Sequence, residues 1–275
     1  VQHNGEEVTT TPGQAAGEVT TSVTRAIGIG VGALGGANAT AAADGTVAIG
    51  HKSLTSLTSG ISNVAIGSGS MATNATSDLN TAVGTQALNK LTMDGYGGDT
   101  AVGFQSAVAL TKGRETTAIG AYALAAEDEG DGSTAVGYAA LYFQNIGGSQ
   151  NDVTGNTGIG AGAGDYNVTG KNNTWVGYHA GYGASGESNS SNTGVGKDAL
   201  LSVTTGGNNT VVGRAAGDAL TDGEGNAFFG ANAGGTTTSA LEVTALGYQA
   251  AYGGNMTAAA IGTVAIGFNS LISLT

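Results

Sequence analysis

The sequence contains no cysteine, which excludes disulfide scaffolds, thiolate metal sites and cysteine nucleophiles. A single proline and the lack of a strict Gly-X-Y period exclude collagen. Charged residues make up only 10% of the chain and hydrophobic residues 40%, which is the wrong balance for a disordered coil. Eight basic residues stand against twenty acidic ones, and the net charge of −12 argues against nucleic acid and anionic membranes as partners.

Long apolar runs are also missing, since no segment approaches the roughly 18 residues of a membrane-spanning helix. The chain opens on Val1 instead of methionine, and its last residue, Thr275, falls inside a repeat without a terminal cap. We therefore expect a piece of a longer chain, so that the lack of a targeting signal carries no weight.

Glycine is abundant, with 51 of 275 residues, and many glycines mark an internal repeat. The segment 80–88, Asn-Thr-Ala-Val-Gly-Thr-Gln-Ala-Leu, recurs with small changes along the chain. The step from one repeat glycine to the next is most often the same, as from Gly50 to Gly67, and it is otherwise longer but never shorter. A constant minimum step with occasional insertions is typical of a repeating coil that carries loops on one side. The repeat glycines are Gly30, Gly50, Gly67, Gly84, Gly103, Gly120, Gly137, Gly160, Gly177, Gly196, Gly213, Gly230, Gly247 and Gly267.

We number the positions of each repeat from its glycine, so that Val83 is position −1 of the Gly84 repeat. Position −1 is always apolar, position −2 is usually Ala, and position +3 is Ala or Ser. Because adjacent strand residues point to opposite faces, one face is expected to line the coil interior and the other to meet a second chain. We expect an acidic residue in place of Val102 or Ile119 to put a charge in the core.

The repeat predicts an all-β fold, because glycine interrupts every β-branched run and Glu, Lys and Arg are scarce. Each repeat offers about two short strands and two turns, which is too little to fold alone. We therefore predict a parallel β-solenoid, or β-roll, of about 14 coils over residues 26–275, preceded by a non-repetitive lead-in over residues 1–25. The repeat glycine is expected where backbones approach or turn.

Position −4 is often asparagine, which tolerates turns and can hydrogen-bond locally or form a ladder with the next repeat. The sequence alone does not distinguish local hydrogen bonding from a ladder between repeats. These residues are Asn63, Asn80, Asn156, Asn173, Asn192, Asn209 and Asn226.

Three segments resemble the head repeats of trimeric autotransporter adhesins: 45–53 (Gly-Thr-Val-Ala-Ile-Gly-His-Lys-Ser), 62–70 (Ser-Asn-Val-Ala-Ile-Gly-Ser-Gly-Ser) and 262–270 (Gly-Thr-Val-Ala-Ile-Gly-Phe-Asn-Ser). Segment 80–88, with its 17-residue step, is similar to the repetitive shafts of bacteriophage tail fibres. The resemblance covers about residues 26–275. It implies parallel β-rolls in which three chains pack side by side, and therefore a homotrimer.

The resemblance also implies a structural and adhesive segment of an extracellular trimeric fibre, on a virion surface or a bacterial cell surface. A phage tail-fibre shaft or receptor-binding region is the first interpretation, because the step of adhesin heads is usually shorter. The head of a bacterial trimeric autotransporter adhesin is the alternative. The implied partners are two further copies of the chain and a glycan or protein receptor at a cell surface, without insertion into the membrane.

No catalytic or cofactor-binding residue is predicted. Segments 28–33, 158–163 and 194–199 fit the pattern G-x-G-x-x-A, but each occupies the same place in the repeat with no helix following. Glycoside cleavage needs paired carboxylates on a rigid scaffold, and only Asp99 and Asp198 fall close to a repeat glycine. We therefore expect a protein that is not an enzyme and has no cofactor, with a polysaccharide-degrading tail spike as the enzymatic alternative.

Acidic loops connect the repeats, and their carboxylate and carbonyl oxygens suit a hard cation such as calcium. Loop acids also serve simply to keep a surface soluble. No metal site is predicted, and the best candidates for one are Glu127, Asp128, Glu129 and Asp131.

Tyrosine and phenylalanine gather just after the repeat glycines and in the longest interval, from Gly137 to Gly160. Stacked repeats would align such side chains into a strip that contacts sugars or protein surfaces. The alternative is that they fill corners between coils or between chains. The candidate receptor-facing residues are Tyr138, Tyr142, Phe143, Tyr178 and Tyr182.

Position −3 is usually threonine, and regular exposed threonine files can bind ice. Because this file shares its strand face with the apolar −1 positions, we expect it to be buried. Its members are Thr81, Thr100, Thr117, Thr134, Thr157, Thr174, Thr193, Thr210 and Thr244.

Overall fold

The computed structural model describes residues 8–9, 26–35, 44–147, 153–186, 188–254, 256 and 260–272. The chain divides into two compact units, of which unit 1 is Val1–Ser133 with Gly147–Asp152 and unit 2 is Thr134–Ile146 with Val153–Thr275. The described residues contain no α-helix, and therefore none that is long and apolar enough to cross a membrane.

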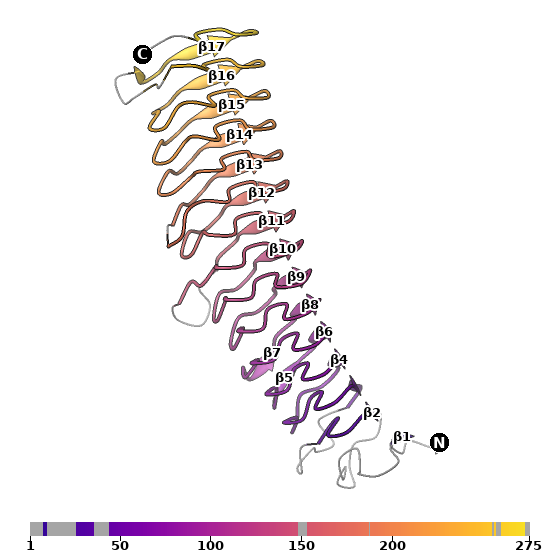
Figure 1. The fold of residues 1–275 in the computed structure, drawn as a ribbon. Helices are drawn as coiled ribbons and strands as arrows, with labels where there is room; N and C mark the ends of the chain where they lie inside the picture. The colour runs from indigo at the N-terminus through magenta and orange to yellow at the C-terminus, as the bar shows by residue number, and fades with distance from the viewer. Residues whose placement is uncertain are drawn as a thin grey trace. The chain divides into compact units, whose positions relative to one another are not determined.

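Unit 1 is a series of coils that each add one short strand to a parallel sheet (Figure 1). Neighbouring strands pair in register, so that Thr81 lies opposite Thr100 and Val83 opposite Val102. A separate pair of short parallel strands, β5 (Ser77–Asp78) and β7 (Gly95–Tyr96), lies in the same unit. The strands of the main sheet are β1 (Val8–Thr9), β2 (Ile27–Ile29), β3 (Val47–Ile49), β4 (Val64–Ile66), β6 (Thr81–Val83), β8 (Thr100–Val102) and β9 (Thr117–Ile119).

Strand β1 belongs to the predicted lead-in 1–25, the rest of which lies outside the described residues. It pairs in parallel with β2, with Val8 opposite Ile27. The sheet of unit 1 therefore extends beyond the first repeat glycine toward the N-terminus.

Unit 2 repeats the same construction, with in-register pairs such as Thr157 opposite Thr174. The observed fold confirms the predicted all-β parallel β-solenoid with its 17-residue step. The strands of unit 2 are β10 (Thr134–Val136), β11 (Thr157–Ile159), β12 (Thr174–Val176), β13 (Thr193–Val195), β14 (Thr210–Val212), β15 (Ala227–Phe229), β16 (Thr244–Leu246) and β17 (Val264–Ile266).

Most coils contain a single short strand, so the expectation of about two strands per repeat is wrong. The strand covers positions −3 to −1, and the chain after the glycine turns repeatedly. In the Gly84 coil, Gln86 has a φ of 59° and Leu88 a φ of 47°, both in the left-handed region. A chain that turns at +2 and again at +4 cannot continue as an extended strand.

Positions −2, +3 and +4 line the interior of the coils, except that Leu271 at +4 of the Gly267 coil is 40% exposed. Ala82, Ala87 and Leu88 of the Gly84 coil are all fully buried. Leu88, at position +4, has a left-handed backbone, and its side chain lies in the core together with that of Ala82, at position −2 of the same coil. Leucine at +4 supplies most of the volume in such coils, which leaves room for only a small side chain at −2.

Positions −3 and −1 lie on the outer face of the sheet. Val102 is half-buried, Ile119 is 40% exposed, and Thr210 is exposed. The expectations that −1 lies in the core and that the threonine file is buried are therefore wrong for the single chain. The physical reason is the volume that leucine takes at +4, which directs the small side chain at −2 inward and its bulkier neighbours outward.

The repeat glycines allow adjacent coils to approach closely. Gly50 has a φ of +132°, and a Cβ placed on it would lie 2.6 Å from the carbonyl oxygen of Gly67. Any side chain at this position would collide with the backbone of the next coil. The predicted role of the repeat glycine, relief where backbones approach, is confirmed.

The asparagines at −4 form a buried ladder between coils. In unit 2 the Oδ1 of Asn192 accepts hydrogen bonds from the backbone N–H of Asn209 at 3.0 Å and from its Nδ2 at 3.0 Å. The same Nδ2 of Asn209 donates to the carbonyl of Gly223 at 2.8 Å. These interactions satisfy buried polar groups, so the ladder is the arrangement that the structure selects.

Large side chains at position −2 are matched by glycine at +4. Trp175 is fully buried, and a Cβ on Gly164 would lie 2.5 Å from its ring. A Cβ on Gly181 would also meet the Trp175 ring. Phe228 has the same relation to Gly217 and Gly234. The core therefore keeps its volume by exchanging an Ala–Leu pair for an aromatic–Gly pair.

Candidate functional site

A continuous series of aromatic rings lies on unit 2. Phe143 stacks on Tyr166 with ring centroids 4.9 Å apart, and Tyr166 meets Tyr182 edge to face at 5.0 Å. Tyr142 contacts Phe143 at 4.6 Å at the start of the series. Four of the five predicted receptor-facing residues, Tyr142, Phe143, Tyr178 and Tyr182, belong to this series.

The far end of the series passes through a histidine. The ring centroid of His179 lies 4.4 Å from that of Tyr182, and His179 stacks on Tyr178 at 3.8 Å. The Lys197 Nζ is 5.7 Å from the centroid of the Tyr178 ring. The aromatic series therefore ends in a cation next to an exposed tyrosine.

We call this series the aromatic strip and define it as Tyr142, Phe143, Tyr166, Tyr182, His179 and Tyr178. Its rings come from consecutive coils, those of β10, β11 and β12, which lie side by side in the sheet of unit 2 (Figure 1). Phe143 is 39% and Tyr178 49% exposed, while the others are half-buried. Tyr138, the fifth predicted residue, is 61% exposed at position +1 of the β10 coil.

Asp165 occupies the +5 position between two tyrosines of the strip. Tyr142 and Tyr182 hold the same position in the preceding and following coils. Asp165 is buried, and its Oδ1 has no hydrogen-bond partner among the described residues. Burial raises the pKa of this carboxyl group to about 6.

The electrostatics of Tyr182 reflect the same surroundings. Burial raises its pKa to about 12, and the hydrogen bond with Tyr166 and the charge of Asp165 act in the same direction. Tyr182 therefore keeps its proton at neutral pH and offers a hydroxyl group, next to an acidic group that is mostly ionised.

Sequence reasoning missed Asp165, Tyr166 and His179, because it collected aromatic residues near the repeat glycine and in the longest interval. Asp165 and Tyr166 could have been found by comparing the residues at positions +5 and +6 of consecutive repeats. Read down the coils, these positions give Tyr142–Phe143, Asp165–Tyr166 and Tyr182.

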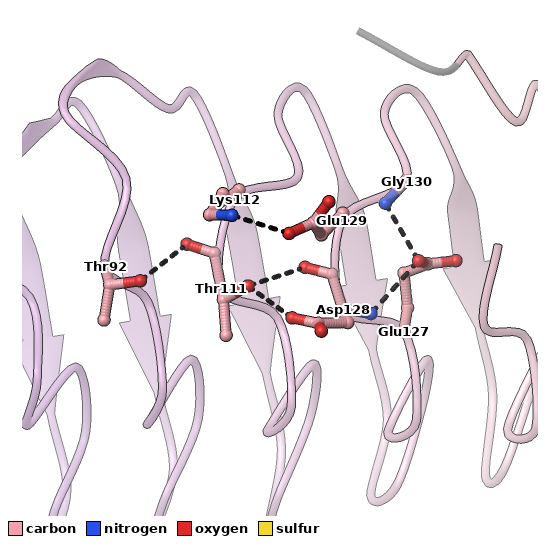
Figure 2. Close-up of polar contacts among 7 residues, drawn as sticks. All are labelled: Thr92, Thr111, Lys112, Glu127, Asp128, Glu129 and Gly130. Atoms are coloured by element: carbon pink, nitrogen blue, oxygen red, sulfur yellow. Dashed lines mark hydrogen bonds and ion pairs between the residues drawn. The ribbon is translucent and has the colours of Figure 1, made fainter. Parts of the chain in front are cut away.

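The four metal candidates of the acidic loop in unit 1 have separate partners, and Figure 2 shows those of Glu127, Asp128 and Glu129. Glu127 is buried, and its Oε1 accepts the backbone N–H groups of Asp128 at 3.0 Å and Gly130 at 2.9 Å. This carboxylate caps the turn of its own loop, at a position where other coils bury leucine.

The remaining three acids contact the preceding coil. The Oδ1 of Asp128 accepts a hydrogen bond from the hydroxyl of Thr111, and Glu129 pairs with Lys112 at 2.7 Å (Figure 2). Asp131 accepts the backbone N–H of Arg114 at 2.8 Å. Over the described ranges, no three acidic or histidine side chains are grouped as a metal site would require. These carboxylates therefore tie coils together.

Replacing Glu129 by Ala is expected to leave the melting temperature of the chain unchanged within error. The Lys112–Glu129 pair lies at the surface, with 42% of the Lys112 side chain exposed, and such pairs contribute little in water. Thermal unfolding followed by circular dichroism measures this. A clear fall in melting temperature would contradict the assignment of the pair as a surface contact.

A shallow hollow of about 300 Å³ on unit 2 brings two glutamates from neighbouring coils together. The Nδ2 of Asn208 donates to Glu224 at 3.0 Å, so one carboxylate already has a partner. No grouped third acid or histidine joins them among the residues that the structure describes. The hollow is lined by Asn208, Glu224, Gly225, Leu241, Glu242 and Ile261.

Comparison of the chain with protein-family models, with curated proteins and with solved structures gave no match. Two features of the molecule bear on its function, the outer face of the sheet and the aromatic strip.

Proposed function

We propose that this chain is a structural and adhesive segment of an extracellular fibre, in which three copies pack side by side through the outer faces of their sheets. A phage tail-fibre shaft or receptor-binding region is the first assignment, and the head of a bacterial trimeric adhesin is the alternative. One observation carries the proposal: in both units the outer sheet face holds apolar and threonine side chains and no charge.

The strands supply this face with a uniform chemistry. Positions −3 and −1 of the repeat strands, from β2 to β17, hold only Thr, Val, Ile, Leu, Phe and Ala. In unit 1, Ile66 is 37% and Ile119 40% exposed; in unit 2, Ile159 is 41% and Leu246 48% exposed. A repeated row of half-exposed branched side chains is a feature of surfaces that bind another protein.

A further copy of the same chain is the occupant that fits this face best. The face repeats at every coil, at roughly 4.8 Å per strand. An identical chain therefore presents side chains with the same spacing in each of its units. Among the residues that the structure describes, no acidic residue lies in a strand of the main sheet, so packing these sheet faces together buries no carboxylate of the strands.

The test is the mass of the chain in solution by light scattering, with a trimerising tag that is then removed. We expect a mass near three chains that persists without the tag. The double change Val102→Asp and Ile119→Asp places two carboxylates on the outer face, and it is expected to reduce the mass to one chain. Glu129→Ala is the matched control and keeps the trimer.

A folded monomer of the unchanged chain would contradict the trimeric fibre. It would favour a second function for the same face, because the outward threonine file supports ice binding. Thermal hysteresis of the monomer, lost when Thr174 and Thr193 are replaced by bulkier Tyr, would support that candidate. A trimer without hysteresis would exclude it.

A further inference from the structure

We infer that the aromatic strip and Asp165 form a binding site for a neutral carbohydrate, with sugar rings stacking on the exposed aromatic faces and a sugar hydroxyl donating to the Asp165 carboxylate. This inference deepens the adhesive part of the proposed function and rests on it. It does not depend on the trimer, because every residue of the site belongs to unit 2 of one chain.

The rings are packed as a surface and do not form a cage. Phe143 and Tyr166 are stacked and nearly parallel, with an angle of 16° between their rings, whereas Tyr142 and Tyr182 meet them edge to face at 78° and 82°. Each ring contacts the next directly, with centroids 4.6, 4.9 and 5.0 Å apart along the series. Phe143 and Tyr178 remain 39% and 49% exposed, and their flat apolar rings suit the C–H face of a pyranose ring.

The polar groups of the site match the hydroxyl groups of a sugar. Asp165 lacks a hydrogen-bond donor at Oδ1 among the described residues, and a buried acceptor without a partner costs free energy. Asp165 keeps about 9% of its surface exposed although Oδ1 itself is covered, so a sugar hydroxyl approaches the carboxylate from the exposed side of the residue. Tyr142 and Tyr182 hold the same position on either side of it, and the Tyr182 hydroxyl, which already bonds to Tyr166, keeps lone pairs that can accept from a sugar hydroxyl.

The dimensions and charge favour a short stretch of a neutral polymer. The strip runs over three consecutive coils, which are separated by two steps of roughly 4.8 Å, so it is about 10 Å long, the length of about two linked sugar rings. The net charge of −12 disfavours an anionic polysaccharide. A neutral hexopyranose polymer fits both constraints.

The inference is tested by the electrophoretic retardation of the full chain in native gels that contain soluble laminarin, galactomannan or dextran. We expect at least one of these neutral polymers to retard the chain, whereas polyethylene glycol at the same mass concentration does not. Equal retardation by polyethylene glycol, or no retardation by any of the three sugars, would overturn the carbohydrate site. Competition by phosphocholine but not by sugars would also overturn it.

Variants locate the site. Phe143→Ala and Tyr178→Ala remove exposed rings and are each expected to weaken retardation by about tenfold. Tyr248→Ala is the matched control, since Tyr248 is 45% exposed on the same unit and stacks on Phe268 away from Asp165. Loss of retardation in all three variants would assign the effect to general apolar adhesion.

Asp165→Asn tests the carboxylate without changing its shape. At pH 7.5 it is expected to reduce retardation to the level that the unchanged chain shows at pH 5, where the Asp165 carboxyl is protonated. Unchanged retardation would remove Asp165 from the site.

Light scattering of the same samples separates the two proposals. A trimer that does not bind sugar contradicts only the carbohydrate site, and a monomer that binds sugar contradicts only the trimeric fibre.

Discussion

Replacing Asp99 by Asn is expected to stabilise the chain at pH 9, with a gain that shrinks toward zero near pH 4. Asp99 stands at position −4, where other coils carry the ladder asparagine. Its backbone N–H donates to the Oδ1 of Asn80 at 3.0 Å, and its own Oδ1 accepts the N–H of Thr116 at 3.0 Å. Its Oδ2 takes the place of the donating Nδ2 and has no partner among the described residues.

The direction of the pH effect follows from the pKa of Asp99. Burial raises this pKa from 3.8 to about 8; the Thr116 N–H lowers it, Asp131 raises it, Arg114 lowers it and Glu115 raises it. Between these values the folded chain binds a proton that the unfolded chain has lost, so stability falls as pH rises. The slope from this group is about 1.4 kcal/mol per pH unit, and it ends above pH 8, where both states are ionised.

The measurement is urea unfolding of both proteins at pH 4, 6 and 9, since other carboxylates titrate alike in the two and cancel in the difference. The exposed Asp222→Asn variant removes the same charge and is expected to show no pH-dependent gain. A difference between Asp99→Asn and the unchanged chain that is the same at all three pH values would contradict the burial of an unpaired carboxyl group.

Replacing Trp175 by Ala is expected to cost about 3–5 kcal/mol of unfolding free energy, the largest effect of any single core truncation in unit 2. Trp175 is fully buried, and glycines surround it. A Cβ on Gly194 would lie 2.7 Å from the Trp175 ring, and one on Gly164 or Gly181 would lie closer still. Neighbours without side chains cannot move in to fill the cavity.

A second change tests the exchange of volume between positions −2 and +4. Gly181→Leu alone collides with the Trp175 ring and is expected to be destabilising. Combined with Trp175→Ala it recreates the Ala–Leu pair of coils such as that of Ala82 and Leu88, and it should recover part of the loss. Denaturant unfolding of the two single variants and the double variant gives the coupling. Additive losses would contradict the exchange.

The solenoid could be predicted from the sequence because its geometry is dictated by position within the repeat. The regular spacing of the repeat glycines, such as Gly67 after Gly50, fixes both the coil length and the strand before each glycine. Which strand face points inward could not be predicted, because Ala at −2 and Val at −1 suit either side of a sheet. The inward face is set by Leu88 and its equivalents at +4, which fill the coil interior. Their left-handed backbone cannot be inferred from the residue type.

The candidate site was predicted only in part. Tyr142, Phe143, Tyr178 and Tyr182 were identified as aromatic residues near the repeat glycines and in the longest interval, but nothing in their spacing showed that their rings touch. The contacts run through Tyr166, a side chain whose partners come from the coils on either side. Contacts between coils depend on insertion length as well as on repeat position, and insertions are the least regular part of the chain.

The pairing of a large side chain at position −2 with glycine has a consequence for how the chain reaches its folded state. Because the coils are nearly identical, a newly formed coil can dock on several others with the same asparagine ladder and the same backbone pairing. Misfolded states in which the coils are shifted by one repeat are therefore possible kinetic traps. Trp175 fits beside Gly164 and Gly181, whereas a slip by one repeat would press its ring against Leu141 or Leu200. Phe228, with Gly217 and Gly234, marks a second place of this kind. The rare aromatic residues of the core thus favour the correct register of the coils, because a stack that is shifted by one repeat contains a steric clash and is destabilised before further coils add to it.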